Sequence, residues 1–114
     1  MIYEMKLNPA PFEMIKSGRK TIELRLLDEK RRQIRVGDGI VFTNTETGET
    51  LSASVTALHV FASFDELYRS LPLLKCGYTE ETLAKASPSD MERYYSAEEQ
   101  KQYGVVGIAL FLHK

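Results

Sequence analysis

The chain has 114 residues, of which 43% are hydrophobic and 27% charged, and its formal net charge is −1. This length fits one domain, residues 1–114, that is large enough to bury a core. No apolar run approaches the roughly 18 residues of a membrane-spanning helix, and residues 1–6 lack the pattern of a secretory signal. The single cysteine excludes an internal disulfide, and no Cys/His spacing is typical of a zinc site. We therefore expect a cytoplasmic domain without a metal or another cofactor.

The first half of the chain predicts four strands and one helix. Alternation of apolar and polar residues places the strands at residues 2–7, 20–26, 40–44 and 50–61. Between the first two strands, Asn8 and Pro9 predict the start of a helix, and Gly18 predicts its C-terminal end. The polar and basic stretch 28–35 is expected to be a loop or a distorted turn. Gly48 predicts a hairpin connection between the last two strands.

The second half predicts several short helices and one closing strand. Capping residues mark the helix starts at Ser63, Thr79, Ser87 and Ser96. The closing strand, at residues 103–112, is rich in β-branched and large apolar residues. This order of elements is typical of an α+β fold. A small, partly closed, mixed β-barrel with short flanking helices fits best, because the last strand can pair with early strands and so remove exposed edges.

The stretch 18–25 joins the first helix to the second strand and carries the candidate site. In a strand, Glu23 and Arg25 project from one face, opposite the apolar residues between and beside them. Lys20 lies at the junction of helix and strand, from which its long side chain can reach both. A carboxylate between two cations stays ionised, because the neighbouring charges lower its pKa. We predict that these three side chains line a small polar pocket.

Such a trio suits two kinds of chemistry. In base recognition, Glu23 would accept a hydrogen bond from an exocyclic amine, while Lys20 or Arg25 would donate to a carbonyl or a phosphate. In amide hydrolysis, Lys20 would carry a proton and Glu23 would position a water, which requires a partly neutral Lys20. The alternative is a salt-bridged network on a solvated strand face, where such pairs contribute little free energy.

Three segments together resemble the ASCH domain family (activating signal cointegrator homology). They are Gly18-x-Lys20-x-x-Glu23-x-Arg25, the turn Val36-Gly37-Asp38, and the closing Tyr103-Gly104-Val105-Val106-Gly107-Ile108. ASCH domains are similar to PUA domains. The resemblance therefore implies a PUA-like small β-barrel with a cleft between barrel and helices, and RNA or a modified nucleoside or nucleotide as the partner.

One branch of this family consists of small amidohydrolases that remove the acyl group from N4-acetylcytidine. Its motif resembles Lys-x-x-Thr-x-Arg, and the Lys, the Thr and a later Glu are assigned to catalysis. Lys20 and Arg25 match this motif, whereas Glu23 stands where the branch has its Thr. The hydroxyl that the branch has at this position is therefore missing. If the chain is an enzyme, Lys20 and Glu23 are its candidate catalytic residues, and Asp65 or Glu66 would be the later acid of the branch.

Other candidates each have a structural alternative. Asn44, at the end of the third predicted strand, is a candidate to hydrogen-bond a base, although an Asn that initiates a turn is the more common case. Glu66 already has a capping role. Tyr94 and Tyr95 are candidates to stack on a base, the alternative being that a ring packs against the barrel. Three further residues lack an evident partner and receive no role: His59, His113 and Cys76.

Charge is unevenly distributed along the chain. Residues 16–35 hold eight basic residues against three acidic ones, and residues 65–101 hold eight acidic against five basic. A domain that binds long nucleic acid through phosphates would be more basic than this. Three functions therefore stay open: RNA or nucleotide binding at the polar cleft, amide hydrolysis of N4-acylated cytidine-type nucleosides, and engagement of an acidic protein through the basic surface of residues 16–35.

Overall fold

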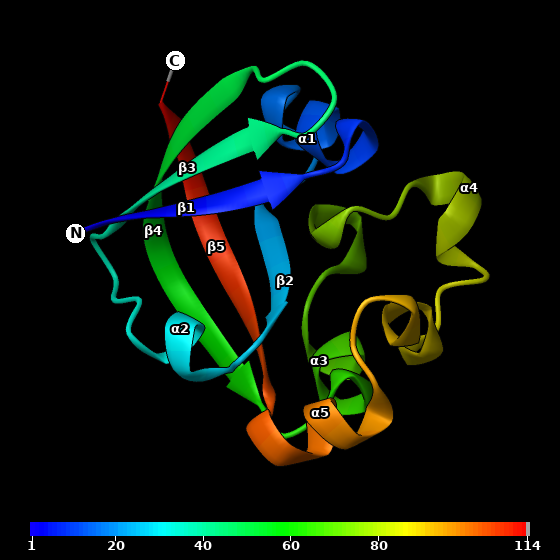
Figure 1. The fold of residues 1–114 in the computed structure, drawn as a ribbon. Helices are drawn as coiled ribbons and strands as arrows, with labels where there is room; N and C mark the ends of the chain where they lie inside the picture. Colours follow the sequence, from blue (N-terminus) through cyan, green and yellow to red (C-terminus); the bar gives the residue numbers. More distant parts are fainter. Residues whose placement is uncertain (114) are drawn as a thin grey trace.

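The computed structural model describes residues 1–113 as a curled five-stranded sheet with short helices packed beside it (Figure 1). The strands are β1 (Ile2–Leu7), β2 (Ile22–Leu26), β3 (Gly39–Asn44), β4 (Thr50–Phe61) and β5 (Val105–His113). The helices are α1 (Pro9–Lys16), α2 (Glu29–Arg32), α3 (Phe64–Ser70), α4 (Glu80–Leu83) and α5 (Ala97–Tyr103), with 3₁₀ helices η1 (Leu73–Cys76) and η2 (Pro88–Arg93). The predicted α+β class and the small mixed barrel are confirmed, the barrel being a half-barrel.

The sheet has the strand order β1-β3-β4-β5-β2, so β1 and β2 are its two edges. β1 runs parallel to β3, and the other neighbours are antiparallel. The curl brings the two edges toward each other, and one side-chain hydrogen bond joins them: Arg25 Nη2 donates to the carbonyl oxygen of Lys6 at 3.3 Å. We call this gap between β1 and β2 the seam.

Two hydrophobic cores pack on the two faces of the sheet. The inner core fills the concave side and includes Phe12 of α1, Phe42 and Ile108. The outer core packs the short helices against the sheet and includes Leu24 of β2 and Phe64 of α3. One face of β2 meets the inner core and the other meets the outer core, so neither face of this strand is turned to solvent.

The prediction of a loop at residues 28–35 is wrong over its first half, where α2 forms. Asp28 caps this helix: its Oδ1 accepts from the backbone N–H of Arg31, and its Oδ2 accepts from Arg31 Nη1 at 2.8 Å. A four-residue helix without a buried residue has no apolar period that a sequence pattern could reveal. The helix starts predicted at Pro9 and at the four later caps are confirmed.

Gly104 connects α5 to β5 with a backbone that favours glycine strongly. Its φ of +76° and ψ of −174° lie in a region that other residues rarely adopt, and an added Cβ would lie 3.1 Å from the carbonyl oxygen of Phe61. We expect Gly104→Ala to lower the free energy of unfolding by about 1–3 kcal/mol in urea denaturation. The matched control is Gly39→Ala in β3, where the backbone is ordinary and the nearest atom is 3.4 Å away. Equal losses in the two variants would contradict this explanation.

Candidate functional site

A cleft of about 620 Å³ lies between the seam and α1 on one side and the segment of short helices after α3 on the other. In Figure 1, β1, β2 and α1 lie on one side, and the chain around α4 lies on the other. The polar and aromatic side chains of the lining are Lys6, Asn8, Lys20, Glu23, Arg25, Tyr68, Tyr78, Thr82, Lys85, Asp90, Arg93, Tyr94 and Tyr95. The three residues predicted to share a pocket therefore do line one cavity.

Glu23 lies at the centre of a buried charged trio in the cleft wall. Its Oε1 is 2.6 Å from Lys20 Nζ, and its Oε2 accepts from Arg25 Nε at 2.9 Å and lies 2.8 Å from Arg25 Nη2. Glu23 is 3% exposed, and the side chains of Lys20 and Arg25 are 11% and 13% exposed. The alternative of a solvated network is therefore wrong for these three residues.

The register of the sheet explains why this polar face is buried. Glu23 pairs with Ile108 and Arg25 pairs with Val106 on β5, and paired residues project from the same face. Ile108 and Val106 belong to the inner core. The face that carries Glu23 and Arg25 is thus the concave face of the half-barrel at its open edge.

Glu23 and Arg25 favour each other's charged forms in the cleft wall. Burial by itself would raise the pKa of the Glu23 carboxyl, but the charges and hydrogen bonds of Lys20 and Arg25 outweigh it and lower the pKa below its usual value. Burial would likewise lower the pKa of Arg25, and the Glu23 carboxylate reverses that effect. The cleft wall is therefore an ion trio with one net positive charge.

Backbone hydrogen bonds to α1 and to η1 hold Lys20 and its neighbour Thr21 in place. The backbone N–H of Lys20 donates to the carbonyl of Met14 in α1, and the N–H of Thr21 donates to the carbonyl of Lys75 in η1. Gly77 follows η1 with a φ of +111°, and a Cβ at this position would lie 3.4 Å from Lys20 Cδ. The Lys20 stem is thus covered by a glycine, and Lys20 lines the cleft.

A second hydrogen-bonded group lines the opposite wall. The Tyr78 hydroxyl donates to Asp90 Oδ2 at 2.6 Å, and the hydroxyls of Tyr68 and Tyr78 are 2.7 Å apart. Burial and these bonds raise the pKa of Tyr78 far above its ordinary value, while the bond from Tyr78 lowers the pKa of Asp90. Burial also raises the pKa of Cys76 to about 11, so this cleft residue is a thiol and not a nucleophilic thiolate.

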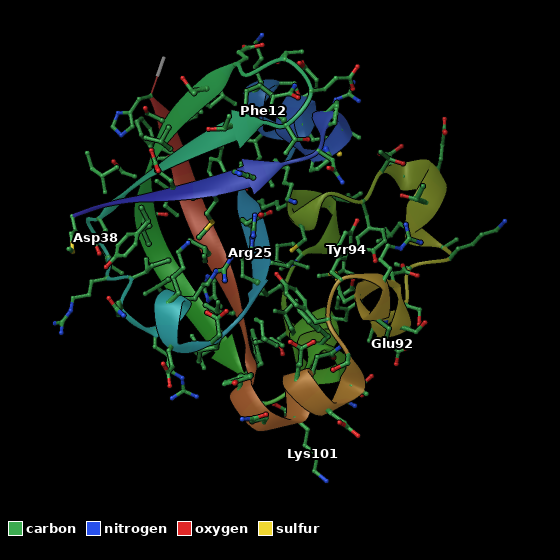
Figure 2. All side chains as sticks on the ribbon, viewed as in Figure 1. Phe12, Arg25, Asp38, Glu92, Tyr94 and Lys101 are labelled. Atoms are coloured by element: carbon green, nitrogen blue, oxygen red, sulfur yellow. The ribbon has the colours of Figure 1, made fainter. Side chains whose placement is uncertain are left out.

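Tyr94 and Tyr95 both line the cleft but in different ways. Tyr95 stacks on Phe64 of α3 with ring centroids 6.3 Å apart and an interplanar angle of 16°. Tyr94 is 60% exposed as a residue, and Figure 2 shows it between the sheet and the helical segment. The Tyr95 ring is therefore used in packing, which was the structural alternative considered from the sequence, whereas the Tyr94 ring keeps an exposed face.

The remaining sequence candidates lie outside the cleft lining. Asn44 is buried in the hairpin, where its Oδ1 accepts from the backbone N–H groups of Glu46 and Thr47. Glu66 Oε2 accepts from the N–H of Ala62 next to the Ser63 cap. His113 bonds with Ser54 at the far end of β5. Turn formation and capping account for the contacts that Asn44 and Glu66 make.

The eight basic residues of 16–35 are divided among several environments. Lys20 and Arg25 lie in the cleft wall, Arg31 pairs with Asp28, and Lys16 pairs with Glu49 on the surface. Arg32 donates to two backbone carbonyls, those of Leu27 and Tyr103. Within residues 1–113, the side chains of three of the eight make no salt bridge or hydrogen bond: Arg19, Lys30 and Arg35, of which Arg35 donates only its backbone N–H, to Asp38 Oδ2.

Apart from Tyr94 and Tyr95, sequence reasoning missed the opposite wall of the cleft. Lys85, Arg93 and the pair Tyr78–Asp90 reach the cavity from a segment at least 50 residues away from Lys20. The available signals were the caps at Thr79 and at Ser87-x-x-Asp90, which indicate helices and not a cavity. Among the described residues, no cluster of His, Cys, Asp and Glu is arranged to hold a metal, and no helix has the length and hydropathy to cross a membrane.

Nearly the whole chain is similar to known ASCH domains. The family model of the ASCH domain matches residues 5–112. Hypothetical protein PH0355 is 37% identical, with a TM-score of 0.81 over 99% of this chain and 100% of its own. Protein PF0455 from Pyrococcus furiosus is also 37% identical, with a TM-score of 0.77 over 100% and 99%. ASCH from Zymomonas mobilis is 18% identical and shares the fold, with a TM-score of 0.63 over 97% of this chain and 67% of its own. The comparison with curated proteins gave no match.

Proposed function

This chain belongs to the ASCH domain family, and on that premise we propose that it binds RNA or a nucleotide in the cleft beside Lys20, Glu23 and Arg25. The observation that carries the proposal is the buried ion trio in the wall of a cavity of about 620 Å³. That volume lies within the range of sites that bind small molecules and cofactors. Burying three charges is costly, so a cleft wall built from them favours a polar ligand.

Each member of the trio would contribute a different contact. The Lys20 ammonium has three donors, of which Glu23 takes one, so donors stay free for a base carbonyl or a phosphate. The Glu23 carboxylate accepts from both cations and retains lone pairs for an exocyclic amine. The exposed ring of Tyr94 would stack on the base.

The test is equilibrium binding of nucleoside monophosphates and short RNAs to the purified protein, compared with Lys20→Gln. We expect Lys20→Gln to lose at least about tenfold in affinity, which corresponds to one charge-assisted hydrogen bond. Lys16→Gln is the matched control, because Lys16 comes from the same segment and pairs with Glu49 away from the cleft. Equal affinities of the two variants would contradict a ligand site at Lys20.

A second pair of variants tests the cleft without altering the trio. Ala10 is exposed in the first turn of α1 and lines the cleft, so Ala10→Trp would obstruct the cavity. Ala97 is exposed in the first turn of α5 and does not line it, which makes Ala97→Trp the control. Ligand binding that survives Ala10→Trp unchanged would place the site elsewhere.

A second candidate function is hydrolysis of an N4-acylated cytidine-type nucleoside in the same cleft. It is favoured by one observation, the contact of 2.6 Å between Lys20 Nζ and Glu23 Oε1 in the cleft wall. In this scheme Glu23 orients the attacking water, and Lys20 carries the proton to the leaving amine of cytidine. Release of cytidine from N4-acetylcytidine, abolished in Lys20→Ala, is the expected result. Absence of turnover by folded protein that binds the nucleoside would exclude this activity.

A further inference from the structure

A second cavity adjoins the cleft across the seam. Its volume is about 400 Å³, and it is lined by Glu4, Met5, Lys6, Arg25, Lys30, Arg31 and Thr43. Lys6 and Arg25 line both cavities. From these two residues, the cleft extends toward α1 and the helical segment, and the second cavity extends toward β3 and α2. Figure 2 shows Arg25 beside β2, in the region between β1 and α2.

The lining of this second cavity carries positive charge that the protein balances only in part. Arg25 and Arg31 are neutralised by Glu23 and Asp28. Lys6 and Lys30 are both exposed, and neither lies within ion-pair distance of a carboxylate of residues 1–113. Glu4 is the one acid of the lining.

Arg31 also has a donor that the protein leaves unused. Asp28 fixes its guanidinium through Nη1 at 2.8 Å, whereas its Nε is buried and has no hydrogen-bond partner among the described residues. Buried donors are nearly always paired in native proteins. An anion in this cavity would lie among Lys6, Lys30 and Arg31 and would balance the charge of its lining.

Resting on the proposed function, we infer that the second cavity is a phosphate subsite and that the ligand is a single-stranded RNA of more than one nucleotide. One base occupies the cleft, the chain crosses the seam at Lys6 and Arg25, and a neighbouring phosphate lies beside Lys30 and Arg31. Lysine ammonium groups contribute as point charges to such phosphate contacts. A free nucleoside or mononucleotide would fill the cleft and leave the subsite empty.

The test compares a nucleoside monophosphate with a hexaribonucleotide of the same base, by equilibrium binding over a series of salt concentrations. The hexanucleotide is expected to bind at least about tenfold more tightly, because its second contact is intramolecular. Lys30→Ala is expected to weaken hexanucleotide binding and to reduce the salt slope by about 0.7, the value for one contact to a single strand. Glu4→Gln is expected to strengthen hexanucleotide binding, since it removes a charge that repels phosphate. Neither variant is expected to change the affinity for the monophosphate.

Arg35→Ala is the matched control, because Arg35 is an exposed basic residue of the same segment that lines neither cavity. A hexanucleotide that binds no more tightly than the monophosphate overturns the subsite and leaves the proposed function intact. Absence of binding by either ligand defeats both. Equal losses in Lys30→Ala and Arg35→Ala overturn the subsite, as does competition by polyglutamate that matches RNA of equal charge, because the surface would then attract any polyanion.

Discussion

Glu23→Ala is expected to lower the free energy of unfolding by about 3–5 kcal/mol, the usual cost of leaving a buried charge without its partner. The variant leaves both Lys20 and Arg25 in the wall of the cleft without a carboxylate. The loss is measured by urea denaturation, from the midpoint and slope of the transition. Adding Lys20→Met to the variant is expected to recover part of it, since one of the two unpaired cations is then gone.

The control for this prediction is Glu49→Ala, which removes the carboxylate of the surface pair with Lys16. Little measurable effect is expected there, because exposed ion pairs are screened by solvent. Acid provides a further check. The lowered pKa of Glu23 stabilises the folded state above the unfolded-state pKa of about 4.3, and this contribution disappears as the pH falls through the folded-state value. The stability gap between wild type and Glu23→Ala should therefore narrow below about pH 4; a constant gap would contradict the buried trio.

The sequence was sufficient to predict the two faces of β2 but not their surroundings. Alternation separates Glu23 and Arg25 from Leu24 whichever way the strand is oriented. Which face meets solvent depends on the curl of the sheet and on the pairing of β2 with β5, and both are long-range properties. A polar face at the concave edge of a half-barrel has the same local pattern as a polar face in water.

The position of Tyr78 and Asp90 in the second wall of the cleft could not be predicted for a similar reason. Tyr78 lies just before α4 and Asp90 lies in η2, and the caps of these two short helices, Thr79 and Ser87, are readable from the sequence. Caps fix where a helix starts, and they carry no information about the element against which it packs. The packing of the outer core against α3 and η1 determines that position.

The identity of the exposed ring also required the structure. Tyr94 and Tyr95 are adjacent in sequence and identical in type, so no local rule ranks them. Stacking of Tyr95 on Phe64 leaves Tyr94 as the ring available to a ligand. Because only Tyr94 of this pair has an exposed ring, the expectation that an aromatic side chain stacks on a base can be tested at Tyr94 alone.

Tyr94→Ala is expected to weaken binding of RNA by about 5- to 150-fold, because stacking of one base on an aromatic ring contributes about 1–3 kcal/mol. The fold should be unaffected, since the ring is exposed and no hydrogen bond of its hydroxyl is found within residues 1–113. Tyr94→Phe keeps the ring and should bind RNA nearly as well as wild type. Affinity is measured by titration of a fluorescently labelled hexaribonucleotide.

Phe111→Ala is the matched control, because Phe111 is a similarly exposed ring, at 64%, on β5 outside the cleft. Its loss should leave the affinity for RNA unchanged. If both variants weakened binding equally, RNA would be contacting exposed rings without preference for the cleft. If Tyr94→Phe failed together with Tyr94→Ala, the hydroxyl and not the ring face would be the contact, and the base would be held by hydrogen bonding. A selective loss in Tyr94→Ala would place a stacked base over the helical wall, opposite the Lys20–Glu23–Arg25 trio.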